Sequence, residues 1–391
     1  MSGRSYLKEK IMLCGESDGI TFKRTFKIVK KISEGASVIC YEAYHGNSGH
    51  GILKEFYPQE AFGVGRDKNG QIVHSTEFKD AYKRFESAMA EYVEPYEMLL
   101  TAKRNDISRE LATFIPPFEI YHGCNDDGVP AGTVYIWTPE PKLFTFDKIC
   151  EEIHKHPTKK PEHKLVTVLS AMDTLAKCIC LLHSSDMLHR DIKPSNFGFI
   201  KRGDDTLTQT LSMFDINTIC SVYGDLDSVV GSLGYMEPEA GYEIATNQTD
   251  IYAIGATLFH AIIVCDETSE NGYVYQKDFF RQIQDLVDNS KLIQASEANS
   301  HPRLRNILAK ILRKCLCERA HRYENCEELI EDLDIALYYA LPSEIAQKHK
   351  SGATWILADV EKSFDNKVET NSTIAIQQLL FEHPLYKYAE D

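Results

Sequence analysis

The segment His189–Asn196, with the letters HRDIKPSN, constrains this chain more than any other stretch. It places a carboxylic acid (Asp191), an amine (Lys193) and an amide (Asn196) on one short loop. Phosphoryl transfer from a nucleotide needs such a set: a carboxylate to orient and deprotonate the accepting hydroxyl, a cation beside the transferred phosphate, and an oxygen ligand for a divalent metal. We therefore interpret the segment as a catalytic loop rather than an ordinary turn.

Size and charge limit what kind of protein this is. A chain of 391 residues with 43% hydrophobic content has room for a two-lobed domain plus an extra segment. The net charge of −15, with no long run of either sign, argues against a nucleic-acid or anionic-membrane surface and suits a basic protein substrate. No apolar run approaches the ~20 residues of a membrane span and no signal-type core follows Met1, so we predict a cytoplasmic location.

The 11 cysteines are an odd number and are scattered along the chain. In a cytoplasmic protein, scattered cysteines are typically reduced and buried. We predict that state for them.

The loop resembles the catalytic loop of the protein kinases, and the chain resembles the bacterial-type serine/threonine protein kinases in particular. The resemblance implies Asp191 as the catalytic base, Lys193 as a phosphate contact and Asn196 as a metal ligand. It also implies that Asp215, which opens an Asp-Ile-Asn in place of the kinase Asp-Phe-Gly, is the second metal ligand, with ATP and Mg as the nucleotide and the metal. Asn217 stands where the family has glycine, and asparagine tolerates left-handed backbone angles better than most residues.

A hairpin is predicted near the N-terminus, with strands over 25–32 and 38–44 and a small-residue turn over 33–37. The resemblance implies that Ser33 and Gly35 of this turn let backbone N–H groups approach the phosphates. Lys54 lies inside the apolar strand predicted for 51–56, and the resemblance implies that it contacts the α- and β-phosphates. An insert-like hairpin is predicted for 65–73.

A long amphipathic helix is predicted from Phe78, and in kinases this helix supplies a glutamate to the nucleotide lysine. By spacing, the place of that glutamate falls near Ala88, which cannot form an ion pair. Glu91 lies on nearly the same helical face and is our first choice. Three further glutamates stay open as alternatives: Glu86, Glu94 and Glu97. Pro95 is expected to kink or restart the helix.

The last strands of the small lobe are predicted for 118–121 and 133–137. In kinases the connection after these strands offers backbone groups to adenine, so the resemblance implies that either Ile136 or Thr138 guards the back of the adenine pocket. Each of these two registers puts a proline where a backbone N–H normally donates. Proline has no N–H, so we predict one fewer hydrogen bond to adenine than usual; alternatively the prolines only stiffen the connection.

The second half of the chain is predicted to carry a helix over 164–183 and a strand pair over 197–200 and 211–214. The segment Gly231–Glu239 resembles the end of a kinase activation segment, where Ser232 can bridge to the catalytic loop. Together with Lys193, Ser232 favours serine/threonine specificity. The region before this segment contains three candidate phosphorylation sites: Ser221, Tyr223 and Ser228.

Two further matches imply structural roles. Asp250 matches the aspartate that braces the catalytic loop. Arg322 matches the arginine that pairs with Glu239, and breaking a buried charge pair of this kind costs ~3 to 5 kcal/mol.

The predicted fold is α+β and bilobal, with a small β-rich N-lobe (25–138) and a larger helical C-lobe (139–341), flanked by an N-terminal extension (1–24) and a C-terminal extension (342–391). The expected function is a serine/threonine protein kinase that uses Mg-ATP, acts on a protein hydroxyl and autophosphorylates. Two alternatives stay open: a pseudokinase or nucleotide-binding regulatory scaffold, and a small-molecule phosphotransferase. The extension 342–391 is expected either to dock on the kinase or to bind a partner or restrain the enzyme.

Overall fold

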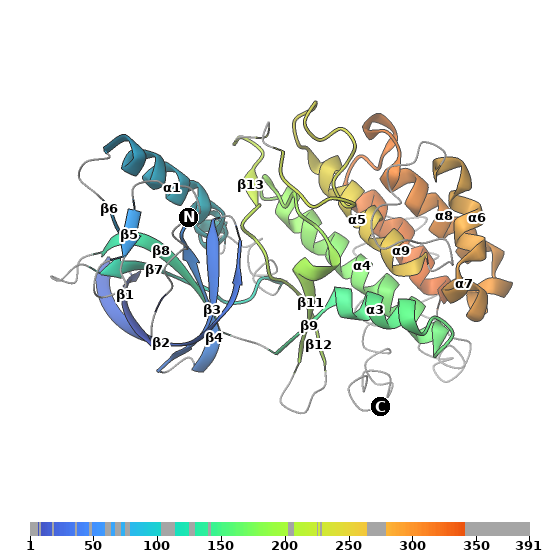
Figure 1. Ribbon diagram of the computed structural model, residues 1–391. Helices are drawn as coiled ribbons and strands as arrows, with labels where there is room; N and C mark the ends of the chain where they lie inside the picture. Colours follow the sequence, from blue (N-terminus) through green and yellow to red (C-terminus); the bar gives the residue numbers. More distant parts are fainter. Residues whose placement is uncertain are drawn as a thin grey trace, which may run out of the picture. The chain divides into compact units, whose positions relative to one another are not determined.

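The computed structural model describes the following residues: 7, 9–17, 19–35, 37–46, 49–58, 64–66, 72–74, 79–102, 114–124, 130–139, 142–201, 207–224, 226, 229–263 and 279–340. The chain divides into two compact units, Met1–Lys142 and Leu143–Asp391 (Figure 1). The predicted C-terminal extension lies outside the described residues.

The small unit is built on a closed barrel with the strand order β1-β2-β3-β4-β8-β7 (Figure 1). Its strands are β1 (Lys10–Ser17), β2 (Ile20–Glu34), β3 (Val38–His45), β4 (Gly49–Phe56), β7 (Glu119–Cys124) and β8 (Pro130–Pro139). All neighbours are antiparallel. The hairpin predicted near the N-terminus is confirmed as β2–β3, and the strands predicted for 118–121 and 133–137 are confirmed as β7 and β8.

The structure differs from the predicted N-terminal boundary. Residues 10–17 were assigned to an extension, but they form β1, which pairs along its whole length with β2. At its other edge β1 meets β7 through Leu13–Gly123 and Cys14–His122. Exposed Lys10 and Met12 alternate with buried Ile11 and Leu13, as a barrel strand requires, but the buried Cys14 and Gly15 interrupt this alternation.

A disulfide joins Cys14 of β1 to Cys124 at the end of β7, across the edge where the barrel closes. Their Cα atoms are 5.6 Å apart, within the range that a disulfide spans. The prediction that the cysteines are reduced is therefore wrong for this pair. The two residues are 110 positions apart in sequence, so only the barrel brings them together. The other described cysteines are free.

Aromatic rings fill the barrel interior. The ring of Phe26 lies 5.1 Å from that of Tyr121 and 5.2 Å from that of Trp137, centroid to centroid. Gly51 of β4 is needed here, since a Cβ at this position would meet the Trp137 ring at 2.4 Å. The barrel is thus a packed core.

A hairpin and a helix complete the small unit. The predicted insert hairpin is confirmed as β5 (Val64–Arg66) and β6 (Ile72–His74). Arg66 of β5 donates two hydrogen bonds to the buried Glu55 carboxylate of β4, at 2.6 and 2.7 Å. The helix α1 (Lys79–Ala102) lies beside the barrel (Figure 1) and runs as one helix through Pro95, so the helix does not restart there, and a kink at Pro95 stays a prediction.

The large unit is mainly helical. Its helices are α3 (Phe146–Lys155), α4 (Pro161–His183), α5 (Asn247–Ile262), α6 (Phe279–Asn289), α7 (Lys291–Ala295), α8 (Pro302–Leu316) and α9 (Cys326–Ala340). The predicted helix over 164–183 is confirmed as α4, which packs against α5 and α9. Prolines at the first turn of α4 and α8 fit these starts, since proline's missing N–H has no intrahelical partner there.

Helix α4 is long and apolar enough to cross a membrane by length and composition, alone among the helices of the described ranges. Polar residues interrupt it, so it does not stand out as an apolar run. However, 78% of its most apolar window is buried inside the structure, and the core helix of a folded domain passes the same test. The observation is weak evidence of a membrane span.

Short strands position the loops of this unit. The predicted pair is confirmed as β11 (Phe197–Lys201) and β12 (Leu207–Met213), with β9 (Lys142–Thr145) on the other side of β11. Gly198 allows this close approach, because a Cβ there would lie 2.3 Å from the Phe144 carbonyl oxygen. A second pair, β10 (Met187–Leu188) and β13 (Cys220–Ser221), holds the chain on both sides of the segment His189–Asn196.

Candidate active site

Asp250, in the first turn of α5, anchors the start of the loop His189–Asn196. Its carboxylate accepts hydrogen bonds from the backbone N–H groups of His189 (2.9 Å) and Arg190 (2.8 Å). It also accepts one from the His183 imidazole (2.9 Å). Burial acts to raise the pKa of Asp250, but these hydrogen bonds and the charge of His183 outweigh it and lower the pKa. Asp250 is therefore an ionised acceptor, and it braces the loop as the sequence implied.

Arg190 adopts a left-handed backbone angle, with φ of 65°, at the point where the loop turns. Gly231 lies directly against this turn: its φ is +139°, and a Cβ there would come within 3.1 Å of the Arg190 carbonyl oxygen. The Thr218 hydroxyl donates to the His189 carbonyl oxygen at 2.7 Å. The Asp250 carboxylate, the Thr218 hydroxyl and the backbone of Gly231 thus hold the turn in an angle that costs energy for a residue with a side chain.

Asp191 is the centre of a hydrogen-bonded cluster. One carboxylate oxygen accepts from the Ser232 hydroxyl at 2.7 Å, and the other accepts from Lys193 Nζ and from the Asn196 amide, each at 2.9 Å. Lys193 Nζ also donates to the Ser232 hydroxyl oxygen at 2.6 Å. The side chain of Asp191 is therefore locked in one orientation, with a cation beside it, and Ser232 bridges to the loop as predicted.

Asn196 and Asp215 lie at the ends of the β11–β12 pair. The backbone N–H of Phe214 donates to the Asn196 carbonyl oxygen at 2.8 Å. This hydrogen bond brings Asp215, the next residue, close to Asn196. Asn217 donates from its amide to one oxygen of Asp215 at 2.7 Å. The backbone of Asn217 is not in the left-handed region, so the left-handed turn considered for this position is absent. Asn217 instead contributes the side-chain hydrogen bond that orients the Asp215 carboxylate.

The donor set of Asn196 and Asp215 suits a hard cation. The Asn196 amide nitrogen donates to the backbone and side chain of Asp191, which turns its side-chain oxygen away from that carboxylate. One amide oxygen and one carboxylate are the kind of ligands that Mg²⁺ takes from a protein when phosphates and water complete its shell. No group of three or more histidine, cysteine, aspartate or glutamate side chains that could hold a metal occurs among the described residues. The residues present thus fit a metal shared with a nucleotide.

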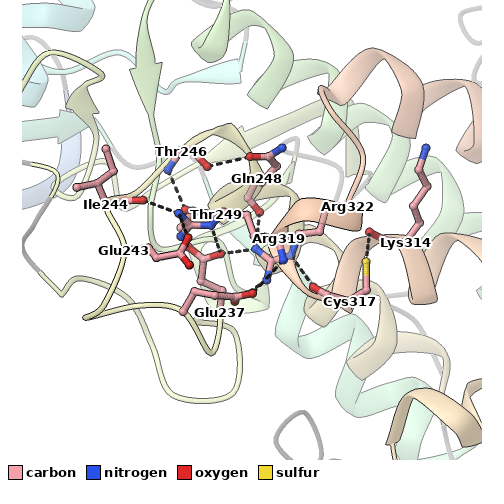
Figure 2. A network of polar contacts seen from close by, with 11 residues as sticks. Glu237, Glu243, Ile244, Thr246, Gln248, Thr249, Lys314, Cys317, Arg319 and Arg322 are labelled. Atoms are coloured by element: carbon pink, nitrogen blue, oxygen red, sulfur yellow. Dashed lines mark hydrogen bonds and ion pairs between the residues drawn. The ribbon is translucent and has the colours of Figure 1, made fainter.

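Glu237 is the centre of a second, structural network (Figure 2). Its carboxylate forms ion pairs with both Arg319 and Arg322 and accepts from the Thr249 hydroxyl of α5 at 2.6 Å. Arg322 also pairs with Glu239 at 2.6 Å, so the predicted pair exists. However, Glu237 is the more deeply buried partner, at 2% exposure. The network ties the segment 237–239 to α5 and to the turn after α8.

Glu237 and Arg319 were not predicted from the sequence, because the family pattern has no acidic residue at position 237. A signal was available in the second glutamate, two residues before Glu239, and the second arginine, three residues before Arg322. Two acidic and two basic side chains at such short spacing can form one compact network.

In the small unit the nucleotide-binding candidates lie on β2, in the turn between β2 and β3, and on β4. The Gly35 backbone N–H donates to the Val38 carbonyl oxygen at 2.8 Å, which closes the tight turn between β2 and β3. Ser33 is not in this turn but in β2, opposite Cys40. Lys54 is half-buried on β4, and its register partners are Cys40 of β3 and Ile136 of β8. A closed, small-residue turn next to a half-buried lysine fits the implied phosphate site.

The structure does not place Glu91 as predicted. Its side chain is exposed on α1, and the neighbouring buried position is Tyr92. The physical reason is that the apolar side of α1 is aromatic and centred on Phe85, Tyr92 and Tyr96, which turns Glu91 towards solvent. Among the alternatives, Glu86, Glu94 and Glu97 are also exposed.

The two candidates for the back of the adenine pocket are neighbours on β8. Ile136 is fully buried and Thr138 is half-buried. Residues 140 and 141 lie outside the described residues, so the choice between the two registers stays open. Of the candidate phosphorylation sites, Tyr223 is 83% exposed and Ser221 is in β13, while Ser228 lies outside the described residues.

Comparison with known proteins shows similarity to protein kinases. Residues 142–332 match the family model described as the protein kinase domain. The chain is 26% identical over 187 residues to serine/threonine-protein kinase PknD of Protochlamydia amoebophila, covering 44% of this chain and 18% of that protein. It is 29% identical over 174 residues to serine/threonine-protein kinase PrkC of Bacillus subtilis, covering 43% and 24%. The chain thus spans less than a third of the length of these relatives.

A solved structure titled "Structure of vaccinia related kinase 3" aligns over 85% of this chain and 91% of that one. The TM-score is 0.48 at 13% identity, too distant a likeness to support a fold assignment.

Proposed function

We propose that the protein transfers the γ-phosphoryl group of Mg-ATP to a serine or threonine hydroxyl of a protein substrate, and that it also phosphorylates itself. The match of residues 142–332 to the protein kinase domain supports this proposal. The observation that carries the proposal is the locked carboxylate of Asp191, with Ser232 on one oxygen and Lys193 on the other. Such a group orients an incoming hydroxyl and accepts its proton.

Each residue of the site has one task in this proposal. Asp191 orients the acceptor hydroxyl and takes its proton, while Lys193, 2.9 Å from Asp191, adds positive charge beside the transferred phosphoryl group. Asn196 and Asp215 hold the metal, which neutralises charge on the phosphates when it is bound. In the small unit, Lys54 contacts the α- and β-phosphates, and the turn at Gly35 offers backbone N–H groups to them.

The test is incorporation of phosphate from γ-labelled Mg-ATP into the protein itself and into a basic acceptor protein. Asp191→Asn should reduce incorporation by about 10²- to 10⁴-fold, the usual contribution of a general base. Asp186→Asn is the matched control, because Asp186 is exposed and its left-handed φ of 57° is one that asparagine tolerates. Equal incorporation by Asp191→Asn and the control would contradict the proposal.

A regulatory scaffold that binds nucleotide is the second candidate. The observation that favours it is the exposure of Glu91, the first choice for the acidic residue on α1. Nucleotide binding without incorporation into any acceptor would support the scaffold. The protein substrate and the cytoplasmic location also stay proposals.

A further inference from the structure

His183, the last residue of α4, has a polar partner at each of its two ring nitrogens. Nε2 lies 2.9 Å from a carboxylate oxygen of Asp250. Nδ1 lies 3.6 Å from the sulfur of Cys326. The side chain of His183 is only 7% exposed, and that of Asp250 is fully buried. The imidazole is therefore held between two side chains that come from different helices, α5 and α9.

Cys326 reaches His183 because it is the first residue of α9. The side chain of Asn325 caps this helix, since its oxygen accepts a hydrogen bond from the Glu328 backbone N–H at 3.0 Å. Helix α9 packs against α4 along its length, and Cys326 is buried. The cap and the helix packing together fix where the sulfur lies relative to the end of α4.

The chemistry of the Asp250 carboxylate determines what the His183 ring has to do. An ionised carboxylate only accepts hydrogen bonds, so Nε2 of His183 carries the proton that it donates. Nδ1 then faces the sulfur of Cys326. Burial is the main cause that raises the pKa of Cys326 well above its ordinary value, so the sulfur keeps its hydrogen. A thiol can donate to Nδ1 of a neutral ring or accept from Nδ1 of a charged one, and in both cases the second contact fixes the orientation of the imidazole.

The orientation of this imidazole bears on the loop His189–Asn196. The carboxylate oxygen that accepts from His183 also accepts from the backbone N–H of His189, and the other oxygen accepts from the backbone N–H of Arg190. If the ring turned away, the fully buried carboxylate of Asp250 would lose one of its donors. A buried charge depends on its hydrogen bonds, so the anchor at the start of the loop would weaken.

We propose that Cys326 is a positioning residue for the loop that carries Asp191: its sulfur holds Nδ1 of His183, which keeps the Nε2 proton on the Asp250 carboxylate. Cys326 acts through His183 and Asp250 and does not take part in the chemistry. These contacts all lie within the large unit, whereas their effect on phosphate transfer rests on the proposed function. The last helix of the described chain thereby supports the start of the loop His189–Asn196.

The first test detects the contact without any nucleotide. The full chain with isotope-labelled histidine is compared by NMR with Cys326→Ala, Cys326→Ser and Cys315→Ala, and the His183 signals are identified by their loss in His183→Gln. The Nδ1 resonance should move in Cys326→Ala and return towards its original position in Cys326→Ser, because a serine hydroxyl can both donate and accept. Cys315→Ala is the matched control, since it removes an equally buried thiol from α8. An Nδ1 resonance that Cys326→Ala moves no more than the control does would overturn the proposal.

The second test measures the consequence for the loop. Exchange of the backbone amide hydrogens of His189 and Arg190 should be about three- to tenfold faster in Cys326→Ala than in Cys315→Ala, the size expected when one hydrogen bond of the anchor is lost. Cys326→Ser should reverse most of this change. Equal exchange in the two alanine variants would contradict the positioning role.

Phosphate incorporation from γ-labelled Mg-ATP should follow the exchange result. It should fall about three- to tenfold in Cys326→Ala, stay unchanged in Cys315→Ala and recover in Cys326→Ser. A loss of incorporation that Cys326→Ser does not restore would contradict the positioning role, because a packing defect explains it equally well. If the unaltered chain incorporates no phosphate, the proposed function fails, and the exchange of the His189 and Arg190 amides still decides whether Cys326 positions the loop.

Discussion

Glu237 should contribute more to the stability of the large unit than Glu239, although Glu239 is the residue that the family pattern selects. Glu237→Gln keeps the shape of the side chain but removes its charge. The Arg322 side chain, fully buried, would then keep one carboxylate, and the Arg319 side chain, 12% exposed, would keep only the more exposed Glu243. Breaking a buried ion pair by removing one partner costs about 3 to 5 kcal/mol.

For a domain of 150 to 250 residues, each kcal/mol lowers Tm by about 2 to 4 °C. Glu237→Gln should therefore lower the unfolding temperature of the large unit by about 6 to 20 °C, followed by near-UV circular dichroism or scanning calorimetry. The matched variant is Glu239→Gln. Its carboxylate is more exposed and pairs with one arginine side chain, so we expect about 1 to 2 kcal/mol.

The difference in stability between these two variants tests whether burial sets the energetics of the network. If Glu239→Gln costs as much as Glu237→Gln or more, burial does not set the energetics of this network, and the central role given to Glu237 is refuted.

Three further predictions follow from other parts of the structure. Thiol titration of the unfolded chain should count two thiols fewer without reductant than with it, and equal counts would contradict the disulfide. Cys14→Ser should abolish that difference and lower the free energy of unfolding by about 2 to 4 kcal/mol. Burial raises the pKa of Asp173 from 3.8 to about 7 against the opposing charge of Lys177, so its stabilising contribution is complete below about pH 4 and is lost as pH rises from about 4 to about 7. Tm should therefore fall between about pH 4 and pH 7 more steeply than in Asp173→Asn, and parallel curves over that range would refute this. Asn217→Ala removes the 2.7 Å hydrogen bond that orients the Asp215 carboxylate. The Mg²⁺ concentration needed for half-maximal phosphate transfer should therefore rise about three- to tenfold, with Tm unchanged. An unchanged Mg²⁺ dependence would contradict this role of Asn217.

Local motifs explain what could be predicted from the sequence. The segment His189–Asn196 fixes the residue types of its own loop, and strong apolar periodicity predicted α1 and α4. Asp250 could be matched because the letters of 250–255 resemble the kinase helix whose aspartate braces the catalytic loop. These features depend on residues close in sequence, or on a pattern that the family repeats.

Features that depend on tertiary pairing could not be predicted. Cys14 and Cys124 meet only because the barrel closes, which no spacing in the sequence reveals. The position of Glu91 depends on which side of α1 is buried, and the aromatic residues at 85, 92 and 96 decide that by their bulk. Glu237 departs from the family pattern, so a comparison of letters treats it as a mismatch rather than as a partner.

The closure of the barrel by β1 has a consequence for any shortened form of this protein. A closed barrel has no exposed strand edge, whereas removal of β1 would leave the backbone N–H and C=O groups of β2 and β7 without partners. Unpaired edges of this kind recruit strands from other molecules. A version of the chain that begins at Thr25, where the sequence alone places the start of the small lobe, would therefore carry a surface for self-association that β1 covers in the intact protein.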